Sequence, residues 1–135
     1  MKYVSTRGQA PVLEFGDVLL AGLATDGGLY VPDTWPAQPD LADLADPALV
    51  GAGYLDVAAA VMAPYVAPSI AGDELRTMVS DAYATFTHPE ICPVTPLGAD
   101  GLHLLELFWG PTIAFKDVAL QLLGHLFDHE LTARG

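Results

Sequence analysis

The chain has 135 residues, of which 52% are hydrophobic and 16% charged, a composition typical of a globular protein and not of a disordered segment. Five basic residues against 17 acidic ones give a formal net charge of −12, and this negative field excludes nucleic acid and anionic membrane surfaces as partners. The single cysteine, Cys92, excludes an internal disulfide and cannot by itself form a zinc cluster, which fits a reducing, cytoplasmic setting.

The apolar segments do not indicate export or a membrane. The N-terminal residues lack the continuous apolar run that a secretory signal needs, so we expect no export. The most apolar window, residues 57–72, contains Pro64 and Pro68 and falls short of the ~20 residues that span a bilayer. It predicts a buried helix and its exit.

The first 32 residues predict a strand, a helix and a second extended piece. The strand covers residues 2–6 and is ended by the polar sequence RGQAP. Near-helical spacing in EFGDVLLAGLA predicts the helix over residues 14–24. TDGGLYVP predicts a glycine turn; it lacks the lysine and the Ser or Thr of a phosphate loop, so Asp26 is interpreted as structural. The apolar residues of the helix are Phe15, Val18, Leu19, Leu20 and Leu23.

Two further helices are expected in the middle of the chain. Residues 32–51, interrupted repeatedly by proline, predict a surface connection before them. The first helix covers residues 54–63. The second has Gly72 and Asp73 as cap candidates and runs through ELRTMVSDAYATF. Its apolar face carries Leu75, Met78, Val79, Ala82 and Phe86.

Beyond residue 90, ICPVTPLG and GLHLLELF predict two extended segments separated by a turn between Gly98 and Gly101. Cys92 has no cationic neighbour in sequence, and we interpret it as a buried, inert thiol. The last helix begins close to Lys116 and is amphipathic. Its apolar stripe consists of Val118, Leu122 and Leu126, with Leu123 and Phe127 alongside.

Lys116 is one of only two lysines and stands at the start of this last helix. One interpretation is a solvated surface lysine. The other is a reactive amine, because a positive helix N-terminus and burial beside Phe115 would both favour the neutral form that attacks a carbonyl to make a Schiff base. The preceding turn, Gly110 to Thr112, supplies a hydroxyl near a helix end that can accept an anion. The residues alone leave both interpretations open.

The four histidines are weaker candidates for chemistry. His125 and His129 are four apart on one helix face, as metal ligands can be, but no glutamate stands between them as in a HExxH motif. His88 precedes a proline in a loop, and His103 alternates with leucines on a predicted strand. We therefore predict no metal site, and metal binding by His125 and His129 is kept only as a third hypothesis.

The segment LELFWGPTIAFKDVALQLLG resembles the stretch around the cofactor lysine of the threonine synthase family, pyridoxal phosphate enzymes of the tryptophan synthase beta-like fold (fold type II). YVSTRGQAP and GLATDGGLYVP resemble the opening of the same family, so the resemblance brackets the chain from both ends. It implies an α/β fold. A small N-terminal α+β domain would cover residues 1–90, and residues 91–135 would form the first strand and helix of the catalytic domain.

The resemblance also implies a chemistry. Lys116 would form a Schiff base with pyridoxal 5′-phosphate (PLP) and later move protons at the substrate carbons. Thr112 and Phe115 are candidates for shaping the pocket, while Gly110 and Asp117 match flanking motif positions. Family members convert O-phospho-L-homoserine (O-phosphohomoserine) and water to L-threonine and phosphate.

Two departures from the family shape the expected function. Trp109 stands where the family commonly has histidine, which would alter the pocket if that position touches cofactor or substrate. The glycine-rich loop for the cofactor phosphate and most of the catalytic domain follow the lysine in family members and are absent here. We therefore expect an N-terminal portion of a threonine synthase that is inactive alone and self-associates through the exposed apolar face of its last helix. The alternative is a non-catalytic interaction module that reuses this N-terminal domain.

Overall fold

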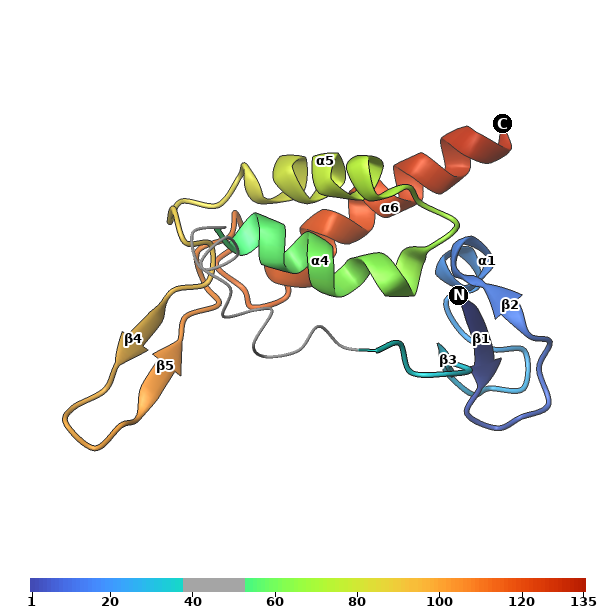
Figure 1. Cartoon of the computed structure of the whole chain (residues 1–135), viewed down its shortest axis with the longest axis horizontal. Coiled ribbons are helices and arrows are strands. Elements are labelled where there is room, and N and C mark those ends of the chain that lie inside the picture. Colours follow the sequence, from blue (N-terminus) through green and yellow to red (C-terminus); the bar gives the residue numbers. More distant parts are fainter. Residues whose placement is uncertain (38–52) are drawn as a thin grey trace.

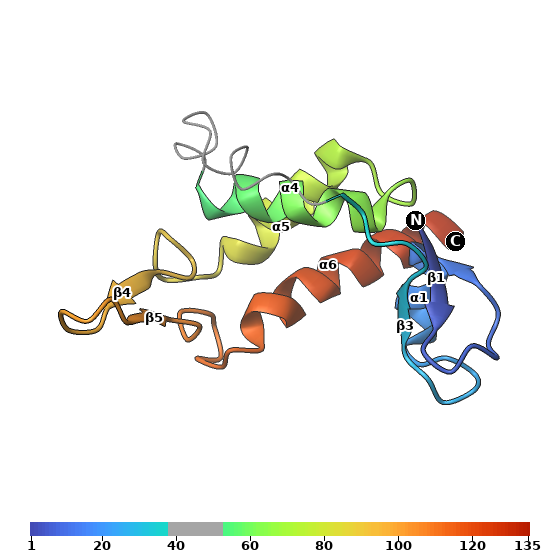
Figure 2. The same ribbon diagram turned by 60° about the horizontal axis from the view of Figure 1, so that its bottom comes forward.

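The computed structural model describes residues 1–37 and 53–135, which form three parts along the molecule (Figure 1). A three-stranded sheet with helix α1 lies at one end, helices α4, α5 and α6 fill the middle, and a two-stranded hairpin projects at the other end. Figure 2 shows the same order from a second direction, with both termini at the end that holds the sheet. This mixture of small sheets and helices confirms the predicted α/β class.

The N-terminal sheet has the order β2-β1-β3, and β1 pairs antiparallel with both neighbours. Strand β1 covers Lys2–Ser5, β2 covers Leu13–Glu14 and β3 covers Tyr30–Pro32. The strand and the extended piece expected before residue 33 are confirmed. Strand β2 was not predicted, because two residues are too few to show the alternation that identifies a strand.

Helix α1, Phe15–Ala21, is shorter than the helix expected over residues 14–24. Gly22 ends it with a φ of 67°, in a left-handed region that favours glycine, and donates its N–H to the Val18 carbonyl. Leu23, which apolar spacing assigned to the helix, lies outside it and is 64% exposed. The assignment of Leu23 was therefore wrong.

The carboxylate of Asp26 organises the loop between α1 and β3. Its Oδ1 accepts hydrogen bonds from Ser5 Oγ at 2.7 Å and from the Gly28 N–H at 2.9 Å. Its Oδ2 accepts from the N–H groups of Gln9 and Ala10, both at 3.0 Å. One side chain thus joins the loop after β1 to the loop before β3, in agreement with the structural interpretation of Asp26.

Replacing Asp26 by asparagine is expected to destabilise the N-terminal sheet. Burial acts to raise the pKa of Asp26, but its four hydrogen bonds outweigh burial and lower the pKa from 3.8 to about 2. A carboxyl with a lowered folded pKa stabilises the fold above its unfolded pKa and loses that contribution as the pH falls through the folded value. Between pH 3.8 and about pH 2, the melting temperature of the native sequence should therefore fall more steeply than that of Asp26→Asn, as followed by circular dichroism. Equal slopes would contradict this role.

The helical layer consists of α4 (Tyr54–Val66), α5 (Gly72–Tyr83) and α6 (Asp117–Arg134). Helix α4 continues one turn beyond the expected end at residue 63, through Pro64. Only one hydrogen bond is lost to a proline in a last turn, and burial of Val66, 5% exposed, favours keeping that turn helical.

Helix α5 differs from the prediction at both ends. Its N-cap is Ala71, whose N–H donates a hydrogen bond to Glu74 Oε2 at 3.2 Å. Gly72 and Asp73 are therefore the first helical residues and not the cap. It ends at Tyr83, and Phe86 reaches the core from the following turn. The apolar spacing therefore identified a core residue correctly but placed it on the wrong element.

The core lies between the three helices. Leu75 and Val79 of α5 are 1% and 0% exposed, and Leu122 and Leu126 of α6 belong to the same cluster, which confirms the centre of the predicted α6 stripe. The cluster includes residues on both sides of residue 90, and the division into two domains there stays a prediction. Its buried members are Val66, Ile70, Leu75, Met78, Val79, Ala82, Tyr83, Ile91, Leu122 and Leu126.

The hairpin pairs β4 (Val94–Pro96) with β5 (His103–Leu105), and all six residues are exposed. Gly98 and Gly101 lie between the strands at φ of 76° and 74°, which confirms the predicted turn. Most of the connection expected over residues 32–51 lies outside the described residues. In the described ranges, no helix combines the length and apolar character needed to cross a membrane.

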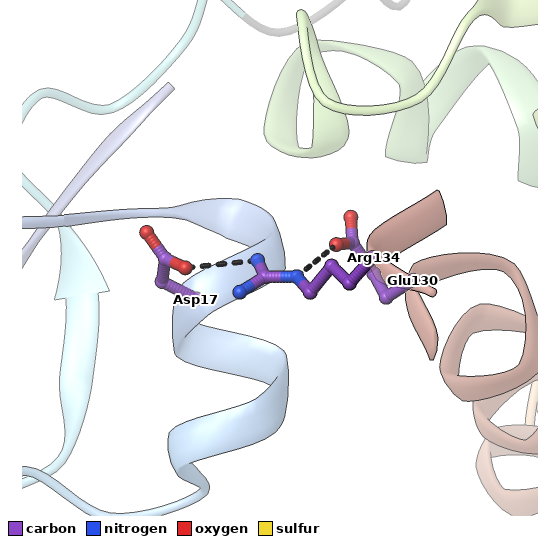
Figure 3. A network of polar contacts seen from close by, with 3 residues as sticks. All are labelled: Asp17, Glu130 and Arg134. Carbon is purple, nitrogen blue, oxygen red and sulfur yellow. Dashed lines mark hydrogen bonds and ion pairs between the residues drawn. The ribbon is translucent and has the colours of Figure 1, made fainter. Parts of the chain in front are cut away.

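An ion-pair network joins α1 to the last turn of α6 (Figure 3). Arg134 Nη2 lies 2.8 Å from Asp17 Oδ1, and Arg134 Nε lies 3.2 Å from Glu130 Oε2. Glu130 is only 7% exposed and packs against Gly16, where a Cβ would overlap its carboxylate. The two terminal regions of the chain are therefore in direct contact through charged side chains.

Candidate functional site

Lys116 lies immediately before α6, on the loop that leads from the hairpin into this helix. Its backbone is already helical, with φ of −64° and ψ of −21°. Its side chain is exposed, and its amine makes no hydrogen bond or ion pair with any residue that the structure describes. The expected burial beside Phe115 is wrong for this chain, because Phe115 is 65% exposed.

Lys116 borders an open hollow of about 570 Å³. Apart from Lys116, every residue that lines this hollow is apolar, and the lining comes from the loop and from the first turn of α6. An apolar concave surface with one polar group at its rim is a common composition for a ligand site. The apolar lining residues are Leu107, Phe115, Val118, Ala119 and Leu120.

Asp117, the next residue, is 2% exposed and is the most buried charged residue in the described part of the chain. Its Oδ2 accepts the Thr112 N–H at 2.7 Å, and its Oδ1 accepts from Thr112 Oγ1 at 2.8 Å. Burial acts to raise the pKa of Asp117, but its hydrogen bonds, those from Thr112 first among them, outweigh burial and lower it. The carboxylate is thus charged at the positive end of α6, where the helix dipole favours an anion.

The start of α6 does not offer an anion site. The N–H groups of residues 117–120 donate to carbonyls of residues 114–116, at distances between 2.8 and 3.3 Å. The Thr112 hydroxyl donates to Asp117. The expectation that this helix end and Thr112 hold an anion is therefore wrong for the described residues, because Asp117 and the loop carbonyls already take these donors.

Gly110 is buried and lies directly against Asp117. A Cβ at position 110 would overlap Asp117 Cβ, which cannot move away unless the first turn of α6 moves with it. Glycine at this position is what allows the loop to approach the helix.

We expect Gly110→Ala to lower the free energy of unfolding by about 1–3 kcal/mol, because overpacking here displaces backbone. Gly124→Ala is the matched control, since Gly124 is exposed on α6 and a Cβ there meets nothing within 4 Å. Alanine at position 124 should stabilise the helix by up to about 1 kcal/mol. Urea denaturation of both variants measures the difference, and equal unfolding free energies would contradict the close approach.

Tyr83, the last residue of α5, fixes the first turn of α6. Its hydroxyl donates to the Val118 carbonyl at 2.8 Å, and its ring packs edge-on against Tyr54 with centroids 5.2 Å apart. Burial raises the pKa of both tyrosines, so Tyr83 remains a donor at neutral pH. Burial also raises the pKa of the partly buried Cys92 thiol, which agrees with its interpretation as unreactive. No sequence signal pointed to Tyr83, because its partner is 35 residues away.

Trp109 contacts the residue that follows β5 and residues of the loop after α5. Its Nε1 donates to Glu106 Oε2 at 2.8 Å, and its ring centroid lies 4.9 Å from that of His88. The Trp109 carbonyl accepts the Thr87 N–H at 3.0 Å. These contacts hold the loop that precedes Gly110, and an effect of Trp109 on a cofactor pocket stays a prediction.

The histidine pair does not gather further ligands. His125 and His129 both lie on α6 and are half-buried. Across residues 1–37 and 53–135, no three His, Cys, Asp or Glu side chains are grouped so that they could hold a metal ion.

Comparison with known proteins relates this geometry to a family. A family model of the threonine synthase N terminus matches residues 2–83. A threonine synthase of Pseudomonas aeruginosa is 51% identical over 135 residues, which are 100% of this chain and 28% of that protein. A threonine synthase of Schizosaccharomyces pombe is 43% identical over 137 residues, covering 99% of this chain and 26% of that protein.

Two solved structures share the fold. PLP-bound threonine synthase from Brucella melitensis matches 100% of this chain with a TM-score of 0.92 at 50% identity, and threonine synthase from yeast matches 98% with a TM-score of 0.88 at 40% identity. The chain spans little more than a quarter of each, 28% and 27%. Because the family model covers more than half of the residues, and the relatives match at both ends, this chain belongs to the threonine synthase family, in the region of its N terminus.

Proposed function

We propose that this chain acts as the N-terminal part of a PLP-dependent threonine synthase in which Lys116 is the cofactor lysine. The observation that carries this proposal is the environment of Lys116. An exposed amine, without a partner among residues 1–37 and 53–135, stands at the rim of an apolar hollow, directly before a helix whose first turn is fixed by Asp117 and Tyr83. The relatives named above are threonine synthases, and one was solved with PLP bound.

The residues present fit the covalent attachment of PLP. An aldehyde needs a free amine, which Lys116 supplies, and the apolar hollow offers Phe115 and Leu120 for packing of a pyridine ring. When bound, PLP supplies an electron sink for charge that develops at the substrate carbons. Lys116 would hold the cofactor and then move protons there, and Thr112 would shape the site through its bonds to Asp117.

The proposed substrate is O-phospho-L-homoserine, converted with water to L-threonine and phosphate. The N–H groups of residues 117–120 and the Thr112 hydroxyl are already taken, so these groups are not available to hold a cofactor phosphate. For this reason we propose that the 135-residue chain alone is inactive. The isolated chain with added PLP should release no phosphate from O-phosphohomoserine, and measurable release above a PLP-only blank would overturn this part of the proposal.

Lys116 can be tested as the PLP site in the chain itself, because Lys2 is an internal reference. The chain is incubated with PLP, the Schiff base is fixed with borohydride, and the labelled peptides are quantified by mass spectrometry. Lys2 is exposed on β1 and does not line the hollow that Lys116 borders. Packing of the ring in the hollow, at ~1 kcal/mol, should favour Lys116 over Lys2 about fivefold. Equal labelling of the two lysines would mean that Lys116 is not a PLP site.

Self-association of the isolated chain is also proposed. A groove of about 470 Å³ between α4, α5 and α6 joins the Lys116 hollow at Val118 and Ala119. Its lining is apolar or aromatic throughout, and surfaces of this kind promote association. Sedimentation at increasing protein concentration should show a rising mass, and a constant monomer mass would contradict the proposal.

A non-catalytic interaction module is the second candidate function, and the uncovered apolar groove is the observation that favours it. The two candidates differ in what Lys116 does. Selective labelling of Lys116 supports the cofactor role, whereas self-association without any selective label supports the interaction module.

A further inference from the structure

We propose that Asp117 is a positioning residue for Lys116: its buried carboxylate fixes the loop that carries the lysine and holds the amine at the rim of the apolar hollow. This inference rests on the proposed function of Lys116 and assigns a role to a residue that does not itself meet the cofactor. It is built on the hydrogen bonds and packing on both sides of Lys116.

The loop before α6 is built from two successive turns. The Ile113 N–H donates to the Gly110 carbonyl at 3.1 Å, and the Asp117 N–H donates to the Ala114 carbonyl at 3.0 Å. Lys116 is the third residue of the second turn. Its position therefore depends on how the first turn is held against the helix.

The first turn contains a strained residue. Ile113 has a φ of 62°, a left-handed conformation that is rare for a β-branched side chain. Its side chain is 74% exposed, so packing of the side chain does not hold this conformation. Such a conformation persists only where neighbouring contacts impose it. The contacts must come from the residues on either side.

Asp117 supplies those contacts. Both of its carboxylate oxygens accept from Thr112, the residue before Ile113, and Gly110 packs against its Cβ. Hydrogen bonds to a charged acceptor are stronger than neutral ones, and Asp117 itself is 2% exposed. The carboxylate thus bridges the first turn and α6, with Lys116 on the segment between the bridged residues.

Other contacts near Lys116 do not replace this bridge. Gln121 Nε2 reaches the same carboxylate at 3.4 Å, near the limit for a hydrogen bond. Tyr83 holds the Val118 carbonyl, which lies beyond Lys116 on the helix side. Loss of the Asp117 carboxylate would therefore leave α6 anchored and release the loop that precedes the lysine.

The test measures the ratio of borohydride-fixed pyridoxyl label on Lys116 to that on Lys2 in the same molecules. Asp117→Ala should lower this ratio about fivefold, to the level of an exposed lysine, because the loop loses both charge-assisted hydrogen bonds. Asp117→Asn should stay within about twofold of the native ratio, since the amide oxygen can accept the Thr112 N–H and the amide nitrogen can donate to the hydroxyl. Gln121→Ala, which removes only the long contact, should leave the ratio unchanged.

Circular dichroism and thermal melting establish that each variant is folded at the labelling temperature. If Asp117→Ala does not fold, Thr112→Val decides the question, because it removes the hydroxyl bond, keeps the N–H bond and should give an intermediate ratio. A native ratio in a folded Asp117→Ala protein, or in Thr112→Val, would overturn the positioning role while leaving Lys116 as the PLP site. Equal labelling of Lys116 and Lys2 in the native sequence would overturn the proposed function, and this inference with it.

Discussion

In a protein completed with the rest of the catalytic domain, Lys116→Ala is expected to abolish PLP attachment and the proposed threonine synthase activity while leaving the fold intact. The Lys116 side chain is exposed and has no partner among the described residues, so its truncation should change the unfolding free energy by no more than about 0.5 kcal/mol. Removing the proposed cofactor lysine should instead lower the activity of the completed protein at least about a thousandfold. Lys116→Ala should therefore lose activity while its unfolding free energy stays nearly unchanged.

The measurement needs the rest of the catalytic domain. A chimera can supply it by joining these 135 residues to the part of the Pseudomonas aeruginosa threonine synthase that lies beyond the matched 28%. Bound PLP is followed by its absorbance and activity by release of phosphate. Lys116→Arg keeps the positive charge but cannot form a Schiff base, so it should be as inactive as alanine, whereas Lys2→Ala should match the native sequence. Retained cofactor absorbance in Lys116→Ala would mean that another amine holds PLP.

The sequence predicted elements whose patterns are local. Strand β1, the hairpin turn at Gly98 and Gly101 and the buried stripe of α6 all follow from alternation, glycine placement or helical spacing within one segment. The errors lie where the spacing of apolar residues continued past the end of a helix. Leu23 extended the apolar pattern of α1 beyond Gly22, and Phe86 extended that of α5 beyond Tyr83, although α1 ends at Ala21 and α5 at Tyr83.

The candidate site was only partly predictable for the same reason. Lys116 could be found from its motif and from its place before a helix. The bonds that fix its surroundings could not, because the Tyr83 to Val118 contact spans 35 residues and the role of Thr112 depends on how a loop folds back onto Asp117. The exposure of Phe115 was missed because an apolar run in sequence was interpreted as buried, and no sequence pattern shows which apolar residues the described chain leaves uncovered.

Leu75→Ala is expected to cause the largest loss of stability, about 2–5 kcal/mol, because it opens a cavity in the centre of the helical core. Leu75 is 1% exposed on α5, which packs against both α4 and α6. A typical domain is stable by only about 5–15 kcal/mol, so this variant loses a large share of its stability and should melt well below the native sequence. Leu120→Ala is the matched control, since Leu120 is 52% exposed on α6 and its truncation should cost no more than about 0.5 kcal/mol.

Leu75 also connects the core to the candidate site, because α5 carries both Leu75 and the Tyr83 that anchors the start of α6. Urea denaturation gives the loss of stability, and borohydride labelling below the unfolding transition gives the effect on Lys116. We expect Leu75→Ala to lose stability but to keep selective labelling while it remains folded, since Asp117 and Thr112 are intact. A stability loss no larger than that of Leu120→Ala would contradict the assignment of the core. Loss of selectivity in the folded Leu75→Ala protein would show that packing of α5, and not the Asp117 bridge alone, determines the position of the lysine.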